Sequence, residues 1–529
     1  MIVWIKRSAH FRSSVLFLFY FVGPGVEAQS YQVAYPIHNG TSVPALGVKL
    51  GWSMAVSNDR VAIGSPHFDA QYGRVSLHAL DGSDEPQLLS YCRDNLINGA
   101  GDNPIQQRFG AMVAMDGEWL VVGNCSPFGA SEYSNEQAAR VLIYLYTDDT
   151  LQAYQSIPAP AASGGAFGKA IAIDQNLIAV GGARSFVAGT WRDVVYLYRK
   201  SGALWPVQPT DSVVSNGTTD LGYGYSLALR NGSLLVGDSG DDELGVDCGA
   251  AFLYGQDQGG TGNWGLVRKL LPSNGLAGDH FGTAVALTND RCVVGAPKNE
   301  IDSLATGAAY VYERDQGFPG NWGESATLEP IGVSAAYMDY GAAVAIGTDR
   351  IAVGAPDHDL GSNGSDGSVH VYQKVDNGWP PLQRIVPYED GIIGQVGRAG
   401  TSLAFHGDQL LIGVPWGTIQ GLDPPPPPNM TTGGVLVYEE GPVSIPELGR
   451  EMFKLWPNPV SNVVHLSDPN GAMAFALVLD TQGRLAMELG KVQREVNTWD
   501  LSILRPGAYL LEVRMRNGER ITRRLIKDQ

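Results

Sequence analysis

The feature that most constrains the fold is an internal repeat. Seven times, a glycine opens an apolar segment and a second glycine closes it 13 residues later. The opening glycines are Gly51, Gly110, Gly168, Gly224, Gly282, Gly341 and Gly400, and successive copies begin 56 to 59 residues apart. A period of this length predicts similar units that bury their apolar surfaces against one another.

Each unit has the pattern of four short β-strands. In the fifth copy, the apolar runs 284–287 and 292–294 flank the polar residues 288–290, as in a tight hairpin. A third apolar segment follows at 308–312, and a more polar fourth segment closes each unit, as at 266–271 in the preceding copy. The near-continuous apolar runs predict strands that are buried on both faces.

Seven units of four strands predict an all-β fold, a seven-bladed β-propeller over residues 29–440. The last unit ends at its third strand, at Tyr438, and residues 31–36 ahead of the first unit are expected to supply the missing fourth. That pairing would remove an open sheet edge. An open β-solenoid is the alternative, although its coils are usually shorter, roughly 20–30 residues.

Charge divides the chain into three parts. Residues 29–450 hold 22 basic and 44 acidic residues, whereas residues 1–28 and 451–529 each have a net charge of +2. The overall charge of -18 excludes nucleic acid as an expected partner. The acidic character belongs to the repeat region, and the two ends have different roles.

Residues 1–28 are expected to be a signal peptide. Three basic residues precede the apolar run 15–22, and Val26-Glu27-Ala28 resembles a cleavage site. A membrane anchor is the alternative, but this run is too short to cross a bilayer about 30 Å thick. No other stretch of 18 apolar residues occurs, so we expect an exported mature chain without a transmembrane span.

The repeats resemble a known family. The first motif half is carried by Phe109-Gly110, Phe167-Gly168, Tyr223-Gly224, Phe281-Gly282 and Tyr340-Gly341, and the second by Gly295-Ala296-Pro297 and Gly354-Ala355-Pro356. These segments resemble FG-GAP repeats, the units of the integrin alpha-subunit propeller and of many exported bacterial proteins. The resemblance covers about 30–440, with departures at Leu50-Gly51 and Ala399-Gly400.

The family's calcium sites are not expected here. Integrin-type repeats carry a calcium loop between strands one and two, but this chain has only short turns such as Asn58-Asp59-Arg60. Such a turn has no room for six or more oxygen ligands.

The connections from strand two to strand three vary in length, and variable loops on a rigid scaffold usually carry binding. We therefore expect the face with these loops, called the loop face, to bind a glycan or protein ligand. Aromatic side chains there could stack on sugar rings or merely anchor the loops. The candidate ligand-binding residues are His67, Asp69, Tyr72, Phe128, Tyr133, Arg184, Trp191, Arg192 and Trp416.

Two of these loops are rich in hard oxygen ligands, which suit calcium. The weak calcium candidates are Asp238, Asp241, Asp242 and Asp247 in the fourth loop, and Asp357, Asp359, Asn363 and Asp366 in the sixth. The alternative is that these residues form solvated turns. Calcium is the only cofactor that the sequence suggests.

Four cysteines are too few for a disulfide framework in a chain of 529 residues. Cys92 and Cys125 are a candidate disulfide because both are expected on the loop face of adjacent blades. Cys248 and Cys292 are expected to be separate buried thiols.

Motifs of known enzyme classes are missing from the sequence: it has no His-Glu-x-x-His, Gly-x-Ser-x-Gly, phosphate loop or paired-cysteine zinc spacing. We therefore expect a binding or adhesion protein. The alternatives are a secreted polysaccharide-active hydrolase or lyase that uses loop-face carboxylates, and a purely structural surface protein.

After a linker at 441–451, residues 452–529 are expected to form a small β-sandwich, with strands near 463–466, 474–479, 508–513 and 521–526. This segment resembles the type IX secretion C-terminal sorting domain of Bacteroidota; an immunoglobulin-like accessory domain is the alternative. The matching pieces are Leu455–Val460, Leu479–Arg484, Trp499–Leu501, Pro506–Leu510 and Arg523–Lys527. The resemblance implies the type IX machinery as a partner, passage across the outer membrane, and release or surface attachment.

Overall fold

The structure is a computed structural model in which the chain forms two units, Met1–Gly441 and Pro442–Gln529. The residues it describes are 29–37, 49–68, 73–80, 87–93, 109–123, 139–148, 150–160, 164–187, 189–216, 222–301, 304–331, 337–359, 364–376, 378–387, 397–417, 433–442, 455–456, 460–468, 473–479, 485–492, 495–515 and 520–528.

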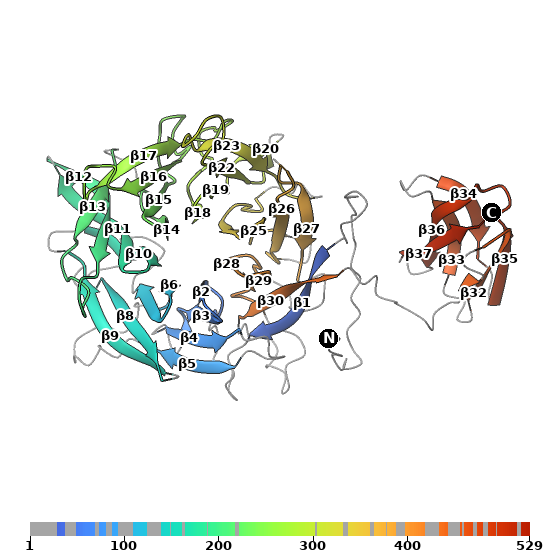
Figure 1. Ribbon diagram of the computed structural model, residues 1–529, viewed down its shortest axis with the longest axis horizontal. Helices are drawn as coiled ribbons and strands as arrows, with labels where there is room; N and C mark the ends of the chain where they lie inside the picture. The colour runs from blue at the N-terminus through green and yellow to red at the C-terminus, as the bar shows by residue number, and fades with distance from the viewer. Residues whose placement is uncertain are drawn as a thin grey trace. The chain divides into compact units, whose positions relative to one another are not determined.

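In the first unit, the described residues form seven four-stranded sheets, here called blades, around a common centre (Figure 1). Consecutive strands in a blade pair antiparallel, as in β18–β19 and β19–β22. The fold is an all-β propeller, as the repeats predicted.

Blades one to three are β2 (Ser53–Ser57), β3 (Arg60–Ser65), β4 (Arg74–Ala79) and β5 (Leu88–Cys92); β6 (Met112–Asp116), β7 (Trp119–Gly123), β8 (Arg140–Thr147) and β9 (Thr150–Pro158); and β10 (Gly164–Asp174), β11 (Leu177–Val187), β12 (Thr190–Arg199) and β13 (Asp211–Val214). Blades four and five are β14 (Ser226–Arg230), β15 (Ser233–Asp238), β16 (Ala250–Gln256) and β17 (Trp264–Leu270); and β18 (Ala284–Leu287), β19 (Arg291–Ala296), β22 (Ala308–Glu313) and β23 (Gly323–Leu328). Blade six is β24 (Ala343–Ile346), β25 (Arg350–Ala355), β26 (Ser368–Gln373) and β27 (Pro381–Ile385). Two short strands between β19 and β22, β20 (Glu300–Ile301) and β21 (Leu304–Ala305), form a hairpin outside the blades.

Blade seven joins the two ends of the repeat region. β28 (Leu403–His406), β29 (Gln409–Gly413) and β30 (Val435–Pro442) are completed by β1 (Gln29–Ile37), which pairs with β30 as predicted. The side-chain amide of Gln383 in blade six also clamps β1. Its Oε1 accepts from the Tyr31 backbone N–H at 2.6 Å, and its Nε2 donates to the Tyr31 carbonyl at 3.1 Å.

The repeated glycines set the spacing between blades. The N–H of Gly282 donates to the carbonyl of Gly295 in the same blade at 3.0 Å. A Cβ added at Gly295 would lie 1.9 Å from the carbonyl oxygen of Gly341, the opening glycine of the next blade. The same contact recurs at every junction of the ring, including 2.3 Å from Gly413 back to Gly51. Glycine is therefore required wherever two blades touch.

The burial of the strands corrects one sequence-based prediction. The second and third strands are buried as predicted, and in β19 five of six residues are buried. The first strands of blades one, four, five, six and seven are not buried on both faces: all four residues of β18, for example, are only half-buried. The reason is their place nearest the centre of the ring, where no further strand covers them (Figure 1). In blades two and three, by contrast, most of β6 and residues 170–173 of β10 are buried.

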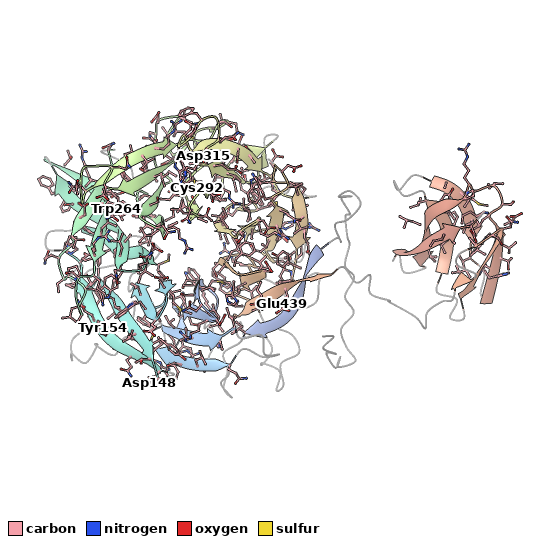
Figure 2. All side chains as sticks on the ribbon, viewed as in Figure 1. Asp148, Tyr154, Trp264, Cys292, Asp315 and Glu439 are labelled. Carbon is pink, nitrogen blue, oxygen red and sulfur yellow. The ribbon has the colours of Figure 1, made fainter. Side chains whose placement is uncertain are left out.

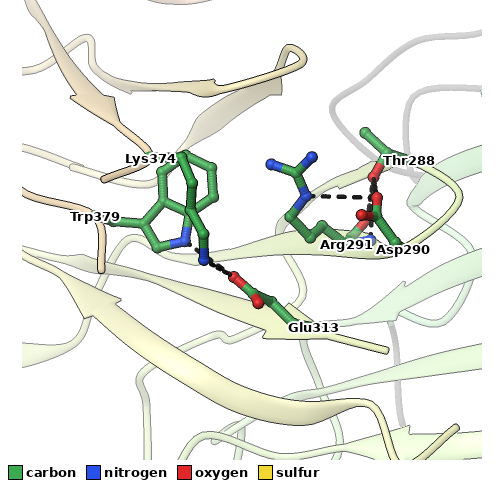
Figure 3. A network of polar contacts seen from close by, with 6 residues as sticks. All are labelled: Thr288, Asp290, Arg291, Glu313, Lys374 and Trp379. Carbon is green, nitrogen blue, oxygen red and sulfur yellow. Dashed lines mark hydrogen bonds and ion pairs between the residues drawn. The ribbon is translucent and has the colours of Figure 1, made fainter. Parts of the chain in front are cut away.

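On the face opposite the loop face, polar contacts bind blade five to blade six (Figure 3). The turn before β19 is closed by the Thr288 N–H, which donates to the Arg291 carbonyl at 2.8 Å. Nearby, Lys374 forms an ion pair with Glu313, and the indole of Trp379 donates to the same carboxylate at 3.4 Å. This face is built from short, internally bonded turns.

The second unit is a small β-sandwich, as predicted. One sheet contains β31 (Leu455–Trp456), β32 (Val463–Asp468) and β35 (Glu495–Asp500), and the other contains β34 (Leu485–Lys491), β33 (Met473–Leu479), β36 (Gly507–Met515) and β37 (Arg520–Lys527). Val464 and Leu466 from the first sheet share one core with Val478, Leu511 and Leu525 from the second. The sequence-based prediction missed β31, β34 and β35.

Candidate functional site

Two positions of each repeat meet on the loop face. We call the residue two before an opening glycine the entry position, and the residue three after a closing glycine the exit position. The entry residues Lys49, His280, Asp339 and Arg398 all have left-handed backbones, with φ between 49° and 54°. Such conformations are costly for residues other than glycine and cluster at functional sites.

At three successive junctions, the exit residue of one blade contacts the entry residue of the next. Lys298 of blade five forms an ion pair with Asp339 of blade six, with 2.5 Å between Nζ and Oδ1. Asp357 of blade six forms an ion pair with Arg398 of blade seven. These pairs occupy equivalent places in the repeat, so the ring itself aligns them.

The third junction closes the ring and is aromatic. The Nζ of Lys49 lies 4.5 Å from the ring centroid of Trp416, and the Arg398 guanidinium lies 4.9 Å from the same centroid. Trp52, next to the opening glycine of blade one, lies 5.1 Å from Trp416 and 6.0 Å from His67, between ring centroids. Cations placed over aromatic rings are attracted by the ring quadrupole.

The eight residues form a continuous surface, which we call the junction belt: Lys298, Asp339, Asp357, Arg398, Trp416, Lys49, Trp52 and His67. Seven of the eight side chains are half-buried and Lys298 is exposed, so solvent reaches the belt while packing holds it. Blades three and four carry small residues, Ala166 and Gly222, at the entry position. The belt is therefore confined to part of the ring.

Two carboxyl groups meet within the belt. Burial raises the pKa of Asp357, the nearby charge of Asp339 raises it further, and Arg398 opposes the shift.

A buried polar chain begins beside Asp357. The Ile331 N–H donates to His370 Nδ1 at 2.8 Å, so the proton of neutral His370 lies on Nε2, which donates to Ser368 Oγ at 3.1 Å. The Ser368 hydroxyl then donates to His358 Nδ1 at 2.9 Å. Burial lowers the pKa of His358 to about 4 and that of His370 well below 6.5.

The propeller should lose stability as the pH falls from about 6.5 to about 4. Both histidines have depressed folded pKa values, so in this window the unfolded chain binds protons that the folded chain excludes. Urea titrations at several pH values measure the slope. His358→Gln should flatten it, and an unchanged slope in this variant would contradict the assignment.

The structure brings together only some of the predicted ligand-binding residues. His67 and Trp416 lie in the junction belt, together with Asp357 from the calcium candidates. Arg184, Trp191 and Arg192 lie instead on the long β11–β12 hairpin of blade three, where Arg184 pairs with Asp193 at 3.0 Å. Asp69, Tyr72, Phe128 and Tyr133 lie outside the described residues.

The calcium candidates of the fourth loop are not gathered around one point. Asp241 pairs with Lys269 at 2.7 Å, and Asp242 accepts from the Asp247 N–H at 2.8 Å. Asp238 is buried at the end of β15. Within the described ranges, no group of three or more His, Cys, Asp or Glu side chains could hold a metal ion.

In the sixth loop, Asp366 is buried and Asp359 is exposed, while Asn363 lies outside the described residues. The cysteines give a mixed result. Cys248 and Cys292 are free buried thiols as predicted, and Cys292 lies within the body of the ring (Figure 2). Cys92 is also a buried free thiol rather than a bridged one, and its predicted partner Cys125 lies outside the described residues.

Sequence reasoning missed Lys49, Trp52, Lys298, Asp339 and Arg398. It searched only the connections between strands two and three, and four of these residues flank opening glycines instead. Most of the belt can be found in the sequence if the seven copies are aligned on their opening and closing glycines. The residues at the entry and exit positions can then be compared between copies.

Comparisons with known proteins agree with this architecture. A family model described as the FG-GAP repeat matches residues 264–312 and 322–372, and one described as the secretion system C-terminal sorting domain matches residues 454–528. The chain thus contains FG-GAP repeats and a type IX secretion C-terminal sorting domain. These two features indicate a protein that is secreted or displayed at the cell surface.

Similar solved structures include PorZ of Porphyromonas gingivalis, described as an essential bacterial surface component of the type-IX secretion system. It has 14% sequence identity and a TM-score of 0.44, with 93% of this chain and 61% of that chain covered. A protein from Lactobacillus plantarum has 12% identity and a TM-score of 0.39, covering 83% and 99%. This chain thus spans less than two thirds of the length of PorZ.

No curated protein matches the sequence. Over the residues that the structure describes, no helix has the length and apolar character needed to cross a bilayer. The sorting domain implies that the chain engages the type IX secretion machinery.

Proposed function

We propose that this protein is a binding or adhesion protein, exported with a signal peptide at residues 1–28, whose junction belt binds a glycan or protein ligand. The observation that carries the proposal is the belt itself. Three equivalent junctions place charged and aromatic side chains side by side on the loop face, on entry residues held in a costly backbone conformation.

The composition of the belt supports recognition. Partly buried tryptophan and arginine side chains contribute most of the binding energy at many interfaces. Trp416 and Trp52 offer flat apolar faces, and Lys49 and Arg398 offer donors beside them. A rigid ring fixes all four, so little conformational entropy is lost on binding.

The geometry favours binding over glycoside hydrolysis. Glycoside hydrolases need one carboxyl group free to protonate the leaving oxygen and a second free to act as base or nucleophile. Asp339 and Asp357 are instead each held in an ion pair with a basic residue, Lys298 and Arg398. A hydrolase or lyase remains the alternative that the assay must separate.

Replacing Trp416 with alanine should weaken ligand retention on a glycan array by about tenfold or more, because it removes the central ring of the belt. Trp191→Ala is the matched control, since it removes a loop-face tryptophan outside the belt. Loss of retention in Trp191→Ala but not in Trp416→Ala would refute the belt as the binding surface.

A reducing-sugar assay on the same glycans tests for turnover. Retention without turnover supports a binding protein. Turnover that disappears in Asp357→Asn would instead support the enzymatic alternative.

A further inference from the structure

A second cluster on the loop face surrounds Phe68 in blade one. The guanidinium of Arg74 lies 4.2 Å from the Phe68 ring centroid, and that of Arg93 lies 4.9 Å from it. Arg74 begins β4 and Arg93 follows β5, so both lie at the loop-face ends of adjacent strands. The Gly73 N–H donates to the Phe68 carbonyl at 3.0 Å, which fixes the ring beside Arg74.

Arg74 is a buried cation that no carboxylate among the described residues neutralises. It is only 4% exposed, its Nε is enclosed without an acceptor, and no described carboxylate forms an ion pair with it. Burial and the nearby charge of Arg93 together lower its pKa to about 10. Removing a charge from water without pairing it is strongly unfavourable. The chain has a net charge of -18, so acidic residues that could pair with an arginine are in excess.

Space for a ligand adjoins the cluster. A cavity of about 360 Å³ shares Tyr91 and Arg93 with it, and is lined by Tyr91, Cys92, Arg93, Tyr144, Leu151 and Ala153. The Tyr91 ring is 55% exposed and lies 5.7 Å from the Arg74 guanidinium. An anion that reaches this cavity would meet a guanidinium and an exposed aromatic face together.

We propose that the Arg74–Phe68–Arg93 cluster binds an oxyanion, a carboxylate or sulfate group, at the loop-face end of blade one. Guanidinium groups bind planar or tetrahedral oxyanions through two parallel hydrogen bonds. The anion supplies the missing counter-charge of Arg74. The proposal does not depend on the junction belt, because none of its residues belongs to the belt.

The test is the thermal stability of the full chain in sodium sulfate against sodium chloride at equal ionic strength. A ligand that binds only the folded state raises the melting temperature as its concentration exceeds its dissociation constant. We expect sulfate to raise it in the natural chain and to have no specific effect in Arg74→Met. Arg60→Met is the matched control, because Arg60 lies over Tyr146 at the same distance of 4.2 Å but at the opposite end of blade one.

Arg74→Met should also melt higher than the natural chain in chloride alone, because replacing an unpaired buried charge with an apolar side chain relieves its desolvation. A lower melting temperature in chloride would show that Arg74 already has its counter-charge, and would overturn the proposal. An equal sulfate effect in the natural chain and in Arg74→Met, or no effect in either, would also overturn it.

Two further measurements complete the design. If Arg74→Met does not fold, Arg74→Lys keeps the charge but loses the two-point hydrogen bonding, and its sulfate effect should shrink by several-fold. Glucuronic acid and neutral glucose distinguish the source of the anion. A larger shift with glucuronic acid than with sulfate indicates a sugar-borne carboxylate, and equal shifts indicate a free inorganic ion.

Discussion

Gly295→Ala should strongly destabilise the propeller, although it adds a single methyl group. The new Cβ would lie 1.9 Å from the Gly341 carbonyl oxygen and 2.9 Å from its carbonyl carbon. Both atoms belong to backbone, which cannot rotate away as a side chain can. Blades five and six would have to move apart, and overpacking of this kind costs about 3 kcal/mol.

The effect should spread beyond one junction. The carbonyl of Gly295 accepts from the Gly282 N–H, so a shift there also disturbs the start of blade five. In a closed ring, a wider gap between two blades forces the other blades to shift as well. Chemical denaturation, followed by tryptophan fluorescence, measures the loss.

Gly378→Ala is the control for this prediction. Gly378 lies in an outer turn, where the nearest atom to an added Cβ is 3.8 Å away. The free energy of unfolding of this variant should match that of the natural chain within about 0.5 kcal/mol. Equal stability of Gly295→Ala and Gly378→Ala would show that the blades are not in contact at the glycines.

Val293→Asp should prevent the first unit from folding at neutral pH. Val293 is completely buried in β19, in a core shared with Val311 and Ile351 of two adjacent blades. A carboxylate at this position would be buried without a partner. The free-energy cost of burying it is comparable with the usual net stability of a domain, about 5–15 kcal/mol. Yield of soluble protein and circular dichroism are the measurements.

Val285→Asp tests the difference between inner and middle strands. Val285 lies in β18, is half-buried, and packs at the edge of the core between blades four and five. A carboxylate there keeps part of its hydration, so the variant should fold with reduced stability. If Val285→Asp were as damaging as Val293→Asp, the first strands would be fully enclosed, contrary to the burial observed here.

The repeat made most of the architecture predictable. The glycine spacing located the β18–β19 hairpin within two residues, and the incomplete last unit pointed to β1 as its fourth strand. These features succeed because they depend on contacts between neighbouring residues or on a count of strands. The strands of the second unit were harder, since β34 and β35 carry mixed polar and apolar residues without clear alternation.

The candidate site was less predictable, because it is made by contacts between repeats. Nothing near Trp416 in the sequence indicates Lys49, which lies 367 positions earlier and meets it only when the ring closes. Arg74 is similar: its burial beside Phe68 and Arg93, with no carboxylate of the described residues paired to it, appears only in the structure. The residue types in the sequence identify candidate binding residues. Which of these residues contact one another depends on how the ring of blades closes.

The partnership of β1 with β30 has a consequence for biogenesis. The earliest strand of the repeat region cannot find its place until the final strand has been synthesised, so the last blade stays incomplete through almost all of translation. Until then β1 lacks its partner strand, and its edges are available for mispairing.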